Sequence, residues 1–290
     1  GDLDRAVRDF DQAIKINPRG AQVYYDRGVS YYSQRKYDQA IADFDQVVRI
    51  DPKDALAYYN RGIAYYGRND FDKAIADLDR AIGLDPKISL AFHNRGNSYA
   101  RKRDFDRAIE DLDQAIKIDA KYAVSFNDRG LAFGAKGQID RAITDFDQAV
   151  KLDAKFAPAF TNRGVAFATK GQTDRAIADF DVAIKLNPSY AVAFYNRANA
   201  YYDKADYDKA VADYDQAIKL NPNDASAFHN RGGAYSNKHD YDRAIADLSQ
   251  SIKFNANNAL VFNDRGTSYA ATRELARAIA ALDQPIKPHP

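Results

Sequence analysis

The chain has 290 residues, with 42 basic and 41 acidic side chains and a formal net charge of +1. Since no long run of one sign occurs, this balance argues against a broad electrostatic grip on nucleic acid or anionic lipid. The absence of cysteine excludes a disulfide framework, a thiol nucleophile and a thiolate metal site. No apolar stretch approaches the roughly 20 residues that cross a bilayer, so we expect no membrane insertion.

The first predicted element is a single helix from Asp4 to Ile16, within the segment 1–20. It matches the second half of the repeat that follows, so we interpret 1–20 as a half repeat that carries only its second helix. The chain begins at Gly1 rather than at methionine, and we therefore expect a fragment or a processed chain. A cytoplasmic location is the default expectation, while an exported one stays open.

From Ala21 onward the sequence repeats every 34 residues without insertion or deletion. Eight full units therefore follow the half unit, and we expect them to form one array over 1–290. The units are 21–54, 55–88, 89–122, 123–156, 157–190, 191–224, 225–258 and 259–290.

The first half of each unit predicts a helix with a small residue between two rings. The fourth position is aromatic, the eighth is Gly or Ala, and the eleventh is aromatic again, as at Tyr58, Gly62 and Tyr65. Offsets of four and three place these residues on one helical face. Glycine weakens a helix by about 1 kcal/mol relative to alanine. Its recurrence therefore indicates that a neighbouring helix packs closely at this position.

The second half of each unit predicts an amphipathic helix. In 55–88 the apolar residues Ala74, Leu78 and Ala81 fall on one stripe. Asp72 suits the positive end of the helix dipole, and Pro86 ends the helix because it lacks a backbone donor. Each unit is thus a helix–turn–helix that cannot bury its stripes alone, so the units must stack on one another.

The 34-residue period, the aromatic–Gly–aromatic spacing and the Ala, Phe/Leu, Ala and Pro columns resemble the tetratricopeptide repeat family. In 55–88 these residues are Tyr58, Gly62, Tyr65, Ala74, Leu78, Ala81 and Pro86. The family usually has Trp at the fourth position and Leu at the seventh, where this chain has Tyr or Phe and an invariant Arg. The resemblance implies an all-α, right-handed solenoid superhelix that acts as a non-enzymatic scaffold or adaptor for protein contacts.

An arginine stands at the seventh position of every full unit: Arg27, Arg61, Arg95, Arg129, Arg163, Arg197, Arg231 and Arg265. An aspartate follows sixteen residues later in seven of them: Asp43, Asp77, Asp111, Asp145, Asp179, Asp213 and Asp247. We predict an Arg–carboxylate pair between the two helices of one unit, since a partly buried Arg seldom lacks a partner. The alternative is a basic ladder that binds phosphates or carboxylates. In the last unit Ala281 replaces the aspartate.

In the fold that the resemblance implies, the second, fifth, sixth, ninth, twelfth and thirteenth positions of each unit should face a concave groove. The sixth is always an amide or a carboxylate, and an amide both donates to and accepts from a peptide backbone. Tyrosines nearby offer contact area with a polar tip. The predicted peptide-binding residues are Tyr25, Tyr59, Asn60, His93, Asn94, Asn97, Asp128, Asn162, Tyr195, Asn196, Asn199, His229 and Asn230. The alternative is that these polar residues only tolerate a half-exposed helical site.

Other site types find no support in the sequence. His93 and His229 lie four units apart, too far to share a metal ion, and no phosphate loop or nucleophile motif occurs. We therefore expect no enzyme activity and no cofactor, and a protein or peptide as the partner. An alternative is a structural protein that assembles by end-to-end stacking of its uncapped repeats. A third candidate, an RNA reader with one unit per base, is disfavoured by the neutral charge.

Overall fold

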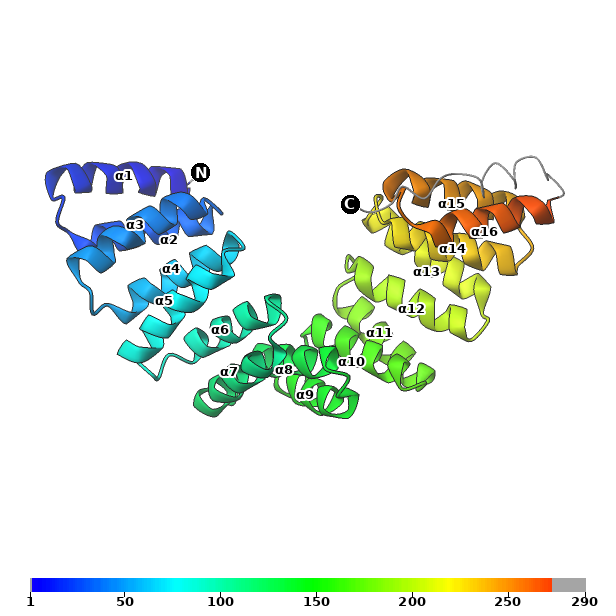
Figure 1. Cartoon of the computed structure of the whole chain (residues 1–290), viewed down its shortest axis with the longest axis horizontal. Coiled ribbons are helices and arrows are strands. Elements are labelled where there is room, and N and C mark those ends of the chain that lie inside the picture. The colour runs from blue at the N-terminus through cyan, green and yellow to red at the C-terminus, as the bar shows by residue number, and fades with distance from the viewer. Residues whose placement is uncertain (1, 273–290) are drawn as a thin grey trace. The chain divides into compact units, whose positions relative to one another are not determined.

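The computed structural model describes residues 2–272, and every regular element in this range is a helix. The described residues fall into two compact units, one ending at Leu152 and the other beginning at Asp153. Figure 1 shows that consecutive helices lie side by side within each unit. The prediction of an all-α fold built from helix–turn–helix repeats is confirmed. No helix between residues 2 and 272 is long and apolar enough to cross a membrane.

The first unit contains a lone helix followed by four helical hairpins, and the lone helix begins two residues earlier than predicted. Its helices are α1 (Asp2–Ile16), α2 (Ala21–Ser33), α3 (Tyr37–Ile50), α4 (Ala55–Gly67), α5 (Phe71–Leu84), α6 (Ser89–Arg101), α7 (Phe105–Ile118), α8 (Ala123–Ala135) and α9 (Ile139–Leu152).

The second unit contains three hairpins and the first helix of a fourth repeat. Its helices are α10 (Ala157–Thr169), α11 (Thr173–Leu186), α12 (Ala191–Asp203), α13 (Tyr207–Leu220), α14 (Ala225–Asn237), α15 (Tyr241–Phe254) and α16 (Ala259–Ala271). The second helix of the repeat 259–290 lies outside the described residues. In both units the even-numbered helices from α2 onward are the first helices of their repeats.

Close packing of the two helices of a repeat explains the recurrent glycine at the eighth position. A Cβ atom added to Gly62 would lie 2.9 Å from Cγ of Leu78 on α5. One added to Gly164 would lie 2.6 Å from Cε1 of Phe180 on α11. Both separations are shorter than real Cβ contacts, so a larger residue there must displace the facing side chain. The predicted close approach of a neighbouring helix is confirmed, and that helix is the second one of the same repeat.

The apolar stripes of the second helices form the core. Ala74, Leu78 and Ala81 of α5 have no solvent exposure. Within each unit, a second helix packs against the first helix of its own repeat and that of the next. The polar face of the first helices therefore lies away from the core, and the candidate site is on this face.

A tight turn joins the two helices of each hairpin, with a left-handed residue at the fifteenth position of the repeat. Gly137 and Gly171 fill this position with φ values of +75° and +72°. Arg35, Asn69 and Ala205 adopt the same region with φ between +58° and +61°. For a residue with a Cβ atom this conformation costs about 1 kcal/mol. The packing of the hairpin on either side must offset that cost.

Candidate functional site

The arginine column pairs with the second helix of its own repeat, as predicted. In the repeat 55–88, Arg61 donates from Nε to Oδ2 of Asp77 at 2.7 Å and from Nη2 to Oδ1 at 2.6 Å. The same two-bond pairing joins Arg27–Asp43, Arg95–Asp111, Arg129–Asp145, Arg163–Asp179, Arg197–Asp213 and Arg231–Asp247. This planar, bidentate geometry fixes the angle between the two helices of a hairpin.

A second carboxylate, which the sequence reasoning missed, joins six of these Arg–Asp pairs, called arginine clamps below, to the preceding repeat. Nη1 of Arg61 donates to Oδ1 of Asp45 on α3 at 2.6 Å. Equivalent bonds of 2.5 to 2.6 Å join Arg27–Asp11, Arg95–Asp79, Arg129–Asp113, Arg197–Asp181 and Arg231–Asp215. The sequence does contain a signal for this second contact, because the second helices carry aspartates two residues apart, as at Asp43 and Asp45.

The pairing leaves these guanidinium groups little capacity for a ligand. The hydrogen bonds that Arg61 donates to Asp77 raise the pKa of Arg61, while burial raises the pKa of the Asp77 carboxyl in spite of Arg61. The cation thus stays charged and uses three nitrogens within the protein. The structural interpretation of the arginine column is confirmed, and an anion-binding ladder finds no support.

Arg265 departs from this pattern. Ser249 occupies the position of the preceding aspartate, and Nη1 of Arg265 lies 3.2 Å from its Oγ. Nε of Arg265 is buried and has no hydrogen-bond partner among residues 2–272. Ala281, which replaces the other aspartate, lies outside the described residues.

The predicted groove residues of the first unit bind one another across consecutive repeats. Asn60 on α4 donates from Nδ2 to the hydroxyl of Tyr25 on α2 at 2.7 Å and to the carbonyl of Leu56 at 2.9 Å. Asn94 on α6 donates in the same way to the hydroxyl of Tyr59 on α4 at 3.3 Å. Burial raises the pKa of Tyr59 to about 12, so its hydroxyl stays protonated at neutral pH. The fifth position of one repeat therefore contacts the sixth position of the next.

His93 lies at the centre of a polar cluster between α6 and α8. Its side chain is buried, with Nδ1 3.0 Å from Oγ of Ser125 and Nε2 3.1 Å from Nδ2 of Asn97. Asn97 also donates to Oδ2 of Asp128 at 2.9 Å. Burial lowers the pKa of His93, and the carboxylate of Asp128 opposes the shift. The cluster joins two repeats, and His93 itself offers little surface to a ligand.

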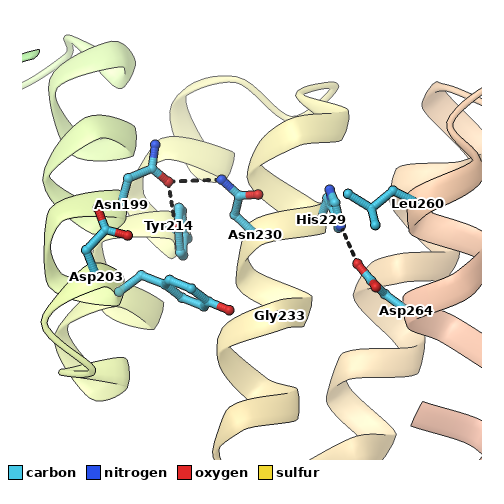
Figure 2. A pocket seen from close by; sticks show the side chains of 9 residues that line it. Asn199, Asp203, Tyr214, His229, Asn230, Gly233, Leu260 and Asp264 are labelled. Atoms are coloured by element: carbon cyan, nitrogen blue, oxygen red, sulfur yellow. Dashed lines mark hydrogen bonds and ion pairs between the residues drawn. The ribbon is translucent and has the colours of Figure 1, made fainter. Parts of the chain in front are cut away.

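In the second unit the structure brings together Tyr195, Asn199 and Asn230, on α12 and α14. Asn230 donates from Nδ2 to the hydroxyl of Tyr195 at 3.0 Å and to Oδ1 of Asn199 at 2.9 Å. The buried Tyr214 of α13 donates its hydroxyl to the same oxygen at 2.6 Å. His229 Nε2 lies 2.8 Å from Oδ2 of Asp264 on α16. Figure 2 shows the contacts of Asn199 with Asn230 and Tyr214, and that of His229 with Asp264, around one pocket.

The other two predicted groove residues are half-buried on first helices. Asn196 on α12 donates to the carbonyl of Val192 at 2.8 Å, and Asn162 lies on α10. No group of three or more His, Cys, Asp or Glu side chains suited to a metal ion occurs between residues 2 and 272.

Each unit holds a pocket on this polar face. The pocket of the second unit has a volume of about 370 Å³ and is lined by Asn199, Tyr202, Asp203, Tyr214, His229, Asn230, Gly233, Leu260 and Asp264. The pocket of the first unit has a volume of about 250 Å³ and is lined by Tyr66, Asn97, Ala100, Arg101, Phe105, Asp128, Leu131 and Ala132. Most of these residues stand at the positions that the sequence assigned to the groove.

Comparison with known sequences identifies the repeat. Profiles described as TPR repeat match residues 1–35, 28–67 and 198–239. Profiles described as tetratricopeptide repeat match residues 55–88, 89–122, 127–191 and 225–258. The chain belongs to the tetratricopeptide repeat family. No curated protein sequence matches it.

Solved structures of other tetratricopeptide repeat proteins are similar in fold. In the crystal structure of the APC/C hetero-tetramer Cut9–Hcn1, one chain matches 96% of this chain with a TM-score of 0.70 and 21% identity. This chain spans only 52% of the length of that protein. A tetratricopeptide repeat protein from Parabacteroides merdae matches 86% of this chain and 98% of its own length, with a TM-score of 0.67 and 16% identity.

YrrB, whose structure is described as that of a TPR protein with an unusual peptide-binding site, is 26% identical. The match covers 65% of this chain and 97% of YrrB, with a TM-score of 0.52. The matches to tetratricopeptide repeats support, in general terms, a role for this chain as a protein-interaction scaffold.

Proposed function

We propose that the chain is a non-enzymatic scaffold that binds an extended peptide, or an extended segment of a protein, along the polar face of its first helices. One observation carries the proposal: the same three positions on three successive first helices line a pocket in each unit. The twelfth, ninth and sixth positions supply Tyr66, Asn97 and Asp128 in the first unit, and Tyr202, Gly233 and Asp264 in the second.

The chemistry of this face suits a peptide backbone, although the Asn side chains are less free than the sequence suggested. Both hydrogen bonds of Asn60 use Nδ2, and so do those of Asn94. Their Oδ1 atoms keep lone pairs that can accept from a peptide N–H. Because the internal bonds also hold each amide in one orientation, the acceptor is pre-positioned and little side-chain entropy is lost on binding.

The likeness to YrrB adds support, since YrrB is described as a peptide-binding protein of the same repeat family. The structure of this chain adds a reason of its own: rings and amides alternate along the face, as at Tyr59, Asn60 and Tyr66. Tyrosine gives contact area at a low entropy cost, and this composition is typical of surfaces that bind polypeptides.

The test is a selection of binders from a displayed library of random peptides, followed by affinity measurement with the selected peptides by fluorescence polarisation. The variant Asn94→Ala/Asn162→Ala/Asn196→Ala should bind them at least about tenfold more weakly, because each substitution removes one acceptor for the peptide. Far-UV circular dichroism should show that its helical content is unchanged.

A matched control removes three amides from another surface. Gln114, Gln148 and Gln216 are exposed on second helices, and their combined replacement by Ala should leave peptide affinity unchanged. If no peptide is enriched, or if the two triple variants lose affinity equally, the polar face of the first helices is not the binding surface.

A further inference from the structure

The pocket of the second unit is acidic. Asp203 at the end of α12 and Asp264 on α16 lie on opposite sides of it (Figure 2), and no Lys or Arg is among its nine lining residues. Asp203 is exposed, and its side chain makes no hydrogen bond or ion pair with any residue between 2 and 272. Asp264 contacts His229 through one oxygen, Oδ2, at 2.8 Å. Both carboxylates are therefore available to a cation.

Two lysines near the pocket in sequence are engaged elsewhere. Lys204, next to Asp203, binds Asp174 of α11 at 2.5 Å. Lys238, which follows α14, pairs with Asp208 of α13. Of the nine residues that line the pocket, only His229 can carry a positive charge, and it contacts Asp264 alone of the two carboxylates.

Gly233 opens the pocket. The ninth position carries a side chain in every other repeat, namely Val29, Ile63, Asn97, Leu131, Val165, Asn199 and Thr267. At Gly233 a Cβ atom would meet the hydroxyl of Tyr202 at 3.5 Å, which is an ordinary contact. A larger side chain would therefore occupy the space that glycine leaves, without a backbone clash.

The remaining walls suit a long side chain with a charged end. Leu260 is exposed at the rim and offers an apolar surface to an alkyl stem. Tyr202 presents an aromatic ring, which attracts a cation through its electron-rich face. Lysine and arginine side chains combine such a stem with such a charge, and the pocket volume of about 370 Å³ lies at the lower end for small-ligand sites.

The equivalent pocket of the first unit differs in charge. It contains Asp128 but also Arg101, and Asn97 stands where the second unit has Gly233. Arg101 lies 5.3 Å from the ring centroid of Phe71. This pocket thus holds a cation of its own and is smaller, which makes it an internal control.

We infer that the pocket formed by Asp203, Gly233 and Asp264 binds the positively charged side chain of a lysine or arginine in the bound segment. The inference rests on the proposed function, since it names the kind of residue that the groove selects at this point. The first-unit pocket does not share this preference.

The experiment is an NMR titration of the ¹⁵N-labelled chain with single capped amino acids, which need no extended peptide. The probes are N-acetyl-lysine methylamide, N-acetyl-arginine methylamide and the neutral N-acetyl-norleucine methylamide. The two cations should cause saturable shifts of the backbone amides of Gly233, Leu260 and Asp264. The amides of Asn97 and Asp128 in the first unit should shift at least about fivefold less.

Two variants test the assignment. Asp203→Asn removes one charge from an exposed position and should weaken cation binding about tenfold. Gly233→Val fills the pocket with the residue found at Val29 and Val165, and should abolish the shifts. Asp26→Asn, which neutralises another sixth-position carboxylate in the first unit, is the matched control and should change nothing.

Shifts of equal size with norleucine, or cation binding that survives both Asp203→Asn and Gly233→Val, would overturn the inference. So would a titration without saturable shifts in the second unit. These results are independent of the peptide selection: enriched peptides that lack Lys and Arg would preserve the proposed function and remove only the charge preference.

Discussion

The substitution Arg61→Ala tests whether the arginine clamp holds the repeats together. Arg61 makes three charged hydrogen bonds, two to Asp77 in its own repeat and one to Asp45 in the preceding one. Alanine removes all three and leaves the Asp77 carboxylate without a counter-charge. The side chain of Asp77 is only 10% exposed, so water replaces the guanidinium poorly.

The expected loss of stability in Arg61→Ala follows from how exposed the paired side chains are. Breaking a buried ion pair by removing one partner costs about 3–5 kcal/mol. Since 16% of the Arg61 side chain and 34% of the Asp45 side chain are exposed, the bond to Asp45 adds little and the total should fall at the lower end. We expect Arg61→Ala to lower the free energy of unfolding by about 3 kcal/mol.

Urea unfolding, followed by far-UV circular dichroism, is the suitable assay because guanidinium salts would screen the ion pairs themselves. Lys73→Ala is the control: Lys73 pairs with Asp70 at 3.3 Å on an exposed surface and should cost no more than about 0.5 kcal/mol. The double variant Arg61→Ala/Asp77→Ala should be more stable than the sum of the single effects predicts. If Arg61→Ala cost no more than Lys73→Ala, the clamp would not be a stabilising element.

Three further predictions use the same unfolding measurement. Ser249→Asp should raise stability by about 0.5–1 kcal/mol, because it supplies Arg265 with the carboxylate found in other repeats; an unchanged midpoint would contradict this. Gly164→Ala should cost about 1–3 kcal/mol through overpacking, whereas Gly83→Ala, with nothing within 4 Å of the added atom, should stabilise its helix by up to about 1 kcal/mol. Burial lowers the pKa of His93, so the unfolded chain binds a proton at this histidine more tightly than the folded chain does. The stability that the folded chain has above the unfolded pKa of about 6.5 is therefore lost as the pH falls below that value. In His93→Asn this loss between pH 7.5 and pH 5.5 should be smaller, and equal losses would argue against the burial of His93.

The fold was predictable because the repeat displays the same physical constraint eight times. A single Gly at a position such as Gly62 would say little, but its recurrence between two rings indicates a packing contact. The pairing of Arg61 with Asp77 could be inferred in the same way, since both residues recur in register. The link to Asp45 could have been found by the same comparison. However, an aspartate on the outer part of a helix is also expected to be solvated, so its recurrence alone does not indicate a partner.

The internal pairing of the groove residues could not be predicted from spacing alone. Whether Asn60 reaches Tyr25 depends on the rise and rotation between two repeats, which a residue pattern does not fix. The pocket of the second unit depends in addition on single departures from the pattern, Gly233 at the ninth position and Asp203 at the thirteenth. A comparison of equivalent positions in the repeats describes what the repeats share and passes over such departures. These residues become informative only when their neighbours in space are known.

The clamp and the groove are coupled through the geometry between repeats. Arg61 fixes α4 relative to α3 and α5, and the bond from Asn60 to Tyr25 joins α4 to α2 on the polar face. The clamp therefore holds the groove residues at the spacing at which their amides meet the neighbouring tyrosines. A peptide that binds this face can use the remaining acceptors without breaking those bonds. Substitutions at the arginine column should consequently weaken peptide binding through the spacing between repeats, even though the guanidinium groups are occupied within the protein.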